Sequence, residues 1–165
     1  MIRMILVLLV LCTASAPLSA QRALELGQAA PQFRLKLLSG GEASLSQFKG
    51  HPVVVNFWAT WCKPCRQEMP EIIAAYQAHR AQHLEILAVN LSDQDKMKDV
   101  RKFVAEMALP FPVLLDQKGK TREQYRLITV PTSIFIDTEG MVRKINAGPI
   151  SARVLQEDIA EILPR

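Results

Sequence analysis

The chain has 165 residues, of which 49% are hydrophobic, and its 20 basic and 16 acidic residues give a formal net charge of +4. The basic residues are scattered and no aromatic side chains are interleaved with them, so this charge gives no support to nucleic-acid binding. The length is enough for one domain with a full-sized core and short for two.

Residues 1–20 have the layout of a secretory signal, with Arg3 before the apolar stretch 4–12 and small residues up to Ala20. An uncleaved anchor is the alternative, but the apolar stretch is short for a spanning helix, which needs about 20 apolar residues. We therefore expect one domain at residues 21–165 in the periplasm or another extracytoplasmic compartment, where disulfides persist.

Four elements are predicted in the first half of the domain. Residues 52–59 indicate a buried strand, because a near-continuous apolar run bounded by turn residues suits the centre of a sheet covered on both faces. A helix follows over residues 62–82, with Pro64 in its first turn, where the missing N–H has no partner to lose. A second strand is expected at 85–91, and apolar residues three and four apart predict an amphipathic helix at 97–107.

The second half of the domain contains shorter elements. We expect strands at 111–115, 133–136 and 141–146, and helices at 120–125 and 151–163. Strands and helices alternate first and a hairpin comes late, so the predicted fold is α/β, with a mixed sheet flanked by helices on both faces.

Cys62 and Cys65 lie two residues apart between the first predicted strand and its helix, and they are the only cysteines of residues 21–165. A structural staple is a weak interpretation, because the stabilisation from a cross-link is smallest for so short a loop. A closed zinc site usually takes four ligands, and no second cysteine pair accompanies the chain's three histidines. Redox chemistry is left, and we expect no metal and no cofactor besides the pair itself.

The position of the pair suggests a role for each cysteine. Cys62 opens the predicted helix, where unpaired N–H groups and the helix dipole favour the reactive thiolate. Lys63 either adds a tuning positive charge or is a solvated lysine on an exposed turn. We expect Cys62 to attack a partner's disulfide and the less accessible Cys65 to resolve the mixed disulfide. A membrane or soluble thiol electron donor must then reduce the pair again.

Five segments of the domain carry a resemblance to a known family. They are GQAAPQF at 27–33, VVVNFWATWCKPCRQEMP at 53–70, ILAVNLSD at 86–93, FPVLLD at 111–116 and VPTSIFIDTEG at 130–140. Together they resemble the TlpA/ResA-like thiol-disulfide oxidoreductases of the thioredoxin superfamily. The resemblance covers nearly all of residues 21–165, and it implies a thioredoxin-like fold with an N-terminal extension and a central insertion.

The resemblance also implies which residues meet the client protein. It implies that the Val130–Pro131 bond is cis and faces the cysteine pair, so that the Val130 backbone can pair with an extended client segment. Trp61 is expected to form an apolar rim beside the nucleophile, and Trp58 either shares that rim or supports it from the core. The residues expected at the client surface are Trp61, Lys63, Pro64, Val130 and Pro131.

Three polar residues are expected around the pair. Asn56 stands where thioredoxin has an aspartate that exchanges protons with the resolving thiol, which an asparagine cannot do. The resemblance implies an acidic residue of the insertion strand instead, and this aligns with Asp93, which the sequence places equally well as a cap of the next helix. Glu68 fits the family's E-x-P pattern, although an acid early in a helix also suits the dipole.

The resemblance implies an enzyme that reduces protein disulfides and has apocytochrome c as one candidate client in cytochrome c maturation. We also expect the protein to be a monomer. One alternative is a thiol peroxidase, since the opening at 27–33 also occurs in peroxiredoxins, but Ala59 stands where those proteins have Thr or Ser. The other alternative is a Sco-like copper carrier, which has C-x-x-x-C spacing and a downstream histidine. No histidine follows His83.

Overall fold

The computed structural model describes residues 24–164, and the expected signal or anchor at residues 1–20 lies outside them. The helices are α1 (Lys63–His79), α2 (Met97–Met107), α3 (Lys120–Gln124) and α4 (Ala152–Ala160), with short 3-10 helices η1 (Leu45–Phe48) and η2 (Arg80–Gln82). The strands are β1 (Arg34–Leu37), β2 (Glu42–Ser44), β3 (Val53–Trp58), β4 (Glu85–Asn90), β5 (Val113–Leu115), β6 (Thr132–Ile136) and β7 (Val142–Ala147).

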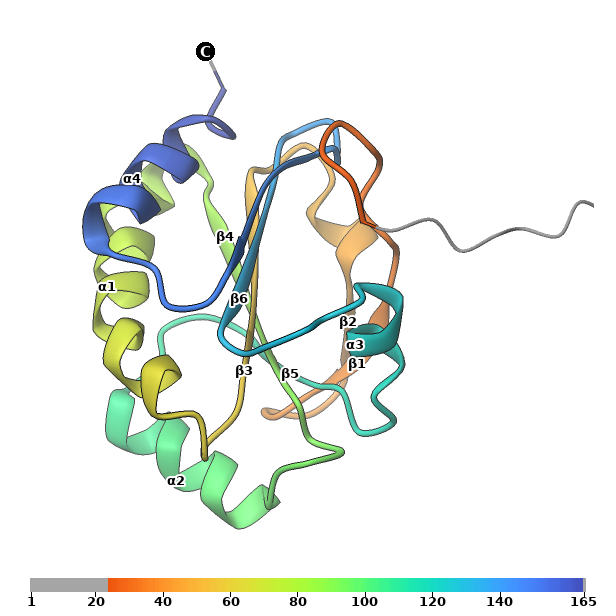
Figure 1. The fold of residues 1–165 in the computed structure, drawn as a ribbon, viewed down its shortest axis with the longest axis vertical. Coiled ribbons are helices and arrows are strands. Elements are labelled where there is room, and N and C mark those ends of the chain that lie inside the picture. The colour runs from red at the N-terminus through yellow and green to blue at the C-terminus, as the bar shows by residue number, and fades with distance from the viewer. Residues whose placement is uncertain (1–23, 165) are drawn as a thin grey trace, which may run out of the picture.

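The strands form one mixed sheet in the order β2-β1-β5-β4-β3-β6-β7. β3 pairs parallel with β4 and antiparallel with β6. Figure 1 shows α1, α2 and α4 on one side of this sheet and α3 on the other. The predicted α/β architecture is confirmed, and in residues 24–164 no helix is long and apolar enough to cross a membrane.

The central strand β3 divides the core in two. All six of its side chains are buried, as the apolar run predicts. Val54 and Trp58 belong to the core cluster under the helices α1, α2 and α4, whereas Val55 and Phe57 belong to the cluster on the opposite face. Side chains of a strand alternate between the two faces, so Asn56 lies on the α1 side with Val54 and Trp58.

The two parallel strands β3 and β4 end side by side, with Trp58 paired to Asn90. β6 runs the other way and begins beside the same edge, where Thr132 pairs with Phe57. Three connections therefore leave or enter the sheet at one edge: the turn before α1, the loop before α2, and the segment before β6.

The hairpin of β1 and β2 is absent from our sequence prediction. Its pairing places Arg34 opposite Ser44, and β1 also pairs with β5, which extends the sheet by two strands. The signal for it was the alternation of basic residues and leucines in RLKL. Gly40 and Gly41 follow with positive φ angles of 102° and 75°, which are values that glycine adopts freely at a tight turn.

Candidate active site

Cys62 and Cys65 form a disulfide with an S–S distance of 2.04 Å at the start of α1. Cys62 is the N-cap in extended conformation, and its sulfur accepts a hydrogen bond from the Cys65 N–H at 3.1 Å. Cys62 keeps 4% of its surface exposed and Cys65 none. This order of exposure suits an attacking and a resolving thiol, in the roles that the sequence suggested.

The segment before β6 meets the edge of the sheet that carries the pair. The Val130–Pro131 bond is cis, as the resemblance implied. Val130 and Trp61 line one small hollow of about 120 Å³ together with Leu127 and Ile128. Within residues 24–164 the N–H of Val130 donates no hydrogen bond to the rest of the chain, so it is free to pair with an extended segment.

The two tryptophans have different surroundings. Trp61 is 57% exposed, and its indole N–H donates to the Gln94 carbonyl at 3.2 Å. Trp58 is fully buried and packs against Phe103, with ring centroids 4.5 Å apart. Trp61 therefore supplies the apolar rim. Trp58 does not share that rim but supports it from the core.

The remaining residues of the expected client surface lie in the first turn of α1 and in the segment before β6. Lys63 is exposed and Pro64 is half-buried. Ile128, which the sequence analysis did not single out, is 97% exposed on the wall of the same hollow. Its signal was the apolar pair Leu127–Ile128 in the loop just ahead of the Val130–Pro131 pair.

A buried carboxyl group lies one helical turn after Cys65. Asn56 donates through its amide nitrogen to Glu68 at 3.1 Å and to the Ser133 hydroxyl at 3.0 Å. The other oxygen of Glu68 accepts the N–H of Ile150 at 3.0 Å. Burial raises the pKa of Glu68 to about 7, although the hydrogen bonds from Ile150 and Asn56 work in the opposite direction. Glu68 can therefore exchange a proton near neutral pH.

Asp93 occupies a different place from the one expected of a cap. The N-cap of α2 is Lys96, so this interpretation is wrong; Asp93 lies in a turn at residues 92–93, and a bend at 94–95 follows before the helix begins. The Asp93 carboxylate instead accepts from Arg122 at 2.9 Å. Gly119 permits this approach, because a Cβ there would lie 2.8 Å from the carboxylate. No hydrogen bond in residues 24–164 joins Asp93 to either cysteine.

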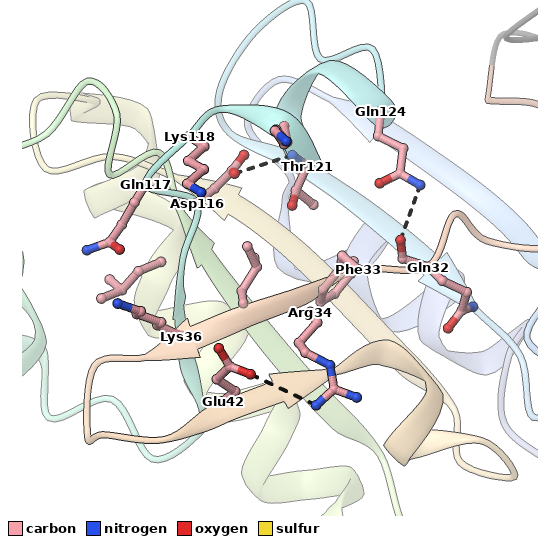
Figure 2. A pocket seen from close by; sticks show the side chains of 13 residues that line it. Gln32, Phe33, Arg34, Lys36, Glu42, Asp116, Gln117, Lys118, Thr121 and Gln124 are labelled. Carbon is pink, nitrogen blue, oxygen red and sulfur yellow. Dashed lines mark hydrogen bonds and ion pairs between the residues drawn. The ribbon is translucent and has the colours of Figure 1, made fainter.

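A second hollow, of about 420 Å³, lies between β1 and the segment before α3 (Figure 2). Several of its polar groups bond to one another, as in the pair of Arg34 with Glu42 and the hydrogen bond from Gln124 to the Gln32 carbonyl. Asp116 accepts from the backbone of Thr121. No cysteine lines it, and the redox pair remains the candidate site. Across the described residues, no three His, Cys, Asp or Glu side chains are grouped to hold a metal.

Comparisons with known proteins agree with this geometry. The AhpC/TSA family matches residues 26–145. The thioredoxin-like protein YneN of Bacillus subtilis is 41% identical over 134 residues, which are 81% of this chain and 78% of that protein. The thiol-disulfide oxidoreductase ResA of Geobacillus thermodenitrificans is 36% identical over 142 residues, which are 86% of this chain and 80% of that protein.

Solved structures show the same likeness. A protein from Chlorobium tepidum, described as a DsbE-type thiol:disulfide interchange protein, superposes with a TM-score of 0.80 at 34% identity, over 86% of this chain and 100% of that chain. StoA from Bacillus subtilis superposes with a TM-score of 0.67 at 34% identity, over 79% and 98% of the two chains. The chain therefore belongs to the AhpC/TSA family and is a ResA-like thiol-disulfide oxidoreductase of the thioredoxin superfamily.

Proposed function

We propose that this protein reduces disulfides of client proteins in an extracytoplasmic compartment, through a dithiol-disulfide cycle of Cys62 and Cys65. The observation that carries the proposal is the position of the disulfide at the N-terminus of α1, directly after the exposed Trp61, which lines one hollow together with Val130. The leader-like residues 1–20 support the compartment.

The cycle transfers two electrons to the client. The Cys62 thiolate attacks one sulfur of the client's disulfide, and the other client sulfur leaves as a thiolate that takes up a proton. Cys65 then loses its proton and attacks the Cys62 sulfur. This step releases the second client thiol and leaves the pair oxidised. A membrane or soluble thiol donor reduces the pair through the same two exchanges in reverse order.

Glu68 is the better-supported proton acceptor for the Cys65 thiol. It follows Cys65 by one helical turn, and it bonds to Asn56, which stands at the position of thioredoxin's aspartate. Its pKa of about 7 lets it take up a proton at neutral pH. Asp93, which the sequence suggested for this role, is held in an ion pair with Arg122 and serves as the comparison.

The client surface has an apolar side and a hydrogen-bonding side. Trp61 and Ile128 face a hollow that fits one apolar side chain, and the Val130 N–H can pair with an extended backbone. Clients are therefore unfolded or extended segments with an apolar residue near the cysteine. Apocytochrome c is one candidate client, and the protein acts on it as a monomer.

The residues around the Cys62–Cys65 pair give no support to the two alternatives, a Sco-like copper carrier and a thiol peroxidase. His83, the last histidine of the sequence, stands before β4, at the opposite edge of the sheet from Cys62. Ala59 provides no hydroxyl for a peroxide substrate.

The first measurement is the reduction potential. The full chain is equilibrated in a series of thiol-disulfide buffers, and peptide-resolved mass spectrometry gives the oxidised fraction of the Cys62–Cys65 pair apart from Cys12. We expect a value near thioredoxin's, about −270 mV, as befits a reductase with a dedicated donor. A value near about −120 mV would instead make the protein an oxidant of clients.

A further inference from the structure

The loop between β4 and α2 is bonded to the turn that presents Cys62. The N–H of Leu91 donates to the Trp58 carbonyl at 3.0 Å, and the indole of Trp61 donates to the Gln94 carbonyl at 3.2 Å. These bonds bridge the ends of β3 and β4, which lie side by side in the sheet. The loop therefore supports the turn along its whole length.

Asp95 makes the strongest of these connections. One of its carboxylate oxygens accepts the Thr60 N–H at 2.7 Å and the Asn90 amide at 3.0 Å. The other oxygen accepts the Thr60 hydroxyl at 2.5 Å and the Lys96 N–H at 3.0 Å. Hydrogen bonds to an ionised group are about twice as strong as neutral ones. Four donors thus converge on one carboxylate, and two of them belong to Thr60.

The sulfur of Cys62 depends on this turn. The Cys62 N–H donates to the Ala59 carbonyl at 3.2 Å, across the residue that Asp95 holds. The sulfur in turn accepts the Cys65 N–H, which is one of the free donors at the start of α1. A turn that shifts would move the sulfur away from these donors and from the positive end of the helix dipole, which favour the thiolate.

The geometry points to Asp95 as a positioning residue for disulfide exchange: its carboxylate fixes Thr60, and thereby holds the Cys62 sulfur against the N-terminus of α1. The inference rests on the proposed function only in taking Cys62 as the nucleophile. It separates Asp95 from Asp93, whose partner is Arg122. Asp95 also differs from Glu68, which is buried one helical turn after Cys65 and bonds to Asn56 and Ile150.

The direction in which the pKa of the Cys62 thiol changes shows whether Asp95 acts by positioning the sulfur or only through its negative charge. A negative carboxylate near Cys62 disfavours the thiolate, so loss of the charge alone would lower the pKa of the Cys62 thiol. Loss of the support would raise it, because the sulfur would leave the helix N-terminus. The other charged groups around the turn stay the same in every variant; they are Lys63, Arg66, Glu68 and the Asp93–Arg122 ion pair.

The experiment follows alkylation of Cys62 by iodoacetamide as a function of pH, in full chains that carry Cys65→Ser. Peptide-resolved mass spectrometry separates Cys62 from Cys12. Asp95→Ala should move the alkylation midpoint upward by about one pH unit, which slows alkylation by about tenfold at pH values well below the midpoint. Asp99→Ala is the matched control, since Asp99 is an exposed acid in the first turn of α2. It should leave the midpoint in place.

A second variant keeps the inference testable if Asp95→Ala does not fold. Thr60→Val deletes one donor to Asp95 and keeps the backbone N–H, so a smaller upward shift is expected. The double variant should shift no further than Asp95→Ala, since both changes remove one interaction. A midpoint that stays in place or falls in both Asp95→Ala and Thr60→Val would overturn the inference. Alkylation needs no client, so an oxidising reduction potential would refute the reductase function and leave this result standing.

Discussion

The two cysteines have separate roles that substitution can distinguish. Cys62→Ser should abolish exchange with a disulfide client, because the thiol that remains, Cys65, is fully buried. Cys65→Ser should trap a mixed disulfide, because nothing remains to attack the Cys62 sulfur. Non-reducing electrophoresis with a model client checks both results. A Cys65→Ser chain that turns over normally would contradict the assigned roles.

The buried carboxyl of Glu68 should make the stability of the oxidised chain depend on pH. Burial raises its pKa from 4.5 to about 7, so between these values the folded chain holds a proton that the unfolded chain has lost. The stabilisation from this proton is complete below pH 4.5 and is lost as the pH rises to about 7. In Glu68→Gln this loss, up to roughly 3 kcal/mol of the free energy of unfolding, should disappear.

Urea unfolding of the oxidised chain at pH 4.5 and 7.5 measures the effect. Only the difference between the two pH values is compared, because a glutamine also places an amide against the Ile150 N–H. Asp93→Asn is the control and should keep the dependence of the parent chain. If the free energy of unfolding of Glu68→Gln keeps the same pH dependence, Glu68 is not the buried titrating group. In reduced chains, a comparison of Glu68→Gln with Asp93→Asn identifies which acid sets the pH dependence of the attack of Cys65 on the mixed disulfide.

At the scale of elements, α2 packs on the end of β3 that precedes the active-site turn, and an aromatic contact contributes to this packing. Phe103 of α2 packs on Trp58 of β3, and the guanidinium of Arg66 lies 4.5 Å from the centre of the Phe103 ring. Phe103→Ala should therefore lower the free energy of unfolding by about 3–5 kcal/mol. Phe48→Ala, at a half-buried position on the other face of the sheet, should cost less. Urea unfolding of the oxidised chains measures both losses of free energy. Equal losses would show that the Phe103–Trp58 contact stabilises the chain no more than a half-buried phenylalanine does.

The elements also show what a sequence can indicate. β3, α1, β4 and α2 were predicted because each has a long apolar period or a distinctive helix start. The β1–β2 hairpin was missed because strands of four and three residues carry too short a pattern. The cysteines and the Val130–Pro131 bond followed from a motif and a resemblance. Glu68 was expected around the pair from the resemblance, but its bond to the Ile150 N–H could not be predicted, and Asp95 was missed altogether. In both cases the partner, Ile150 or Thr60, is far away in the sequence.

At the scale of the whole molecule, the site combines a local part with a distant part. The disulfide closes over a separation of only 3 residues. The segment of Val130 reaches the pair because β6 lies next to β3 in the sheet. The core clusters on the two faces hold this arrangement from both sides. Chemistry at the sulfur thus depends on one turn, whereas client recognition depends on the complete sheet.

The neighbouring positions of β3 and β6 also bear on how the chain can be shortened. All six side chains of β3 are buried and five of them are apolar, and β6, with β7 beyond it, covers one of its long sides. A chain that stops before residue 132 would leave β3 as an edge strand, with unpaired N–H and C=O groups and apolar side chains on both faces. Such edges recruit strands from other molecules. The last fifth of the sequence therefore shields β3 from such pairing, besides holding the Val130 segment in place through β6.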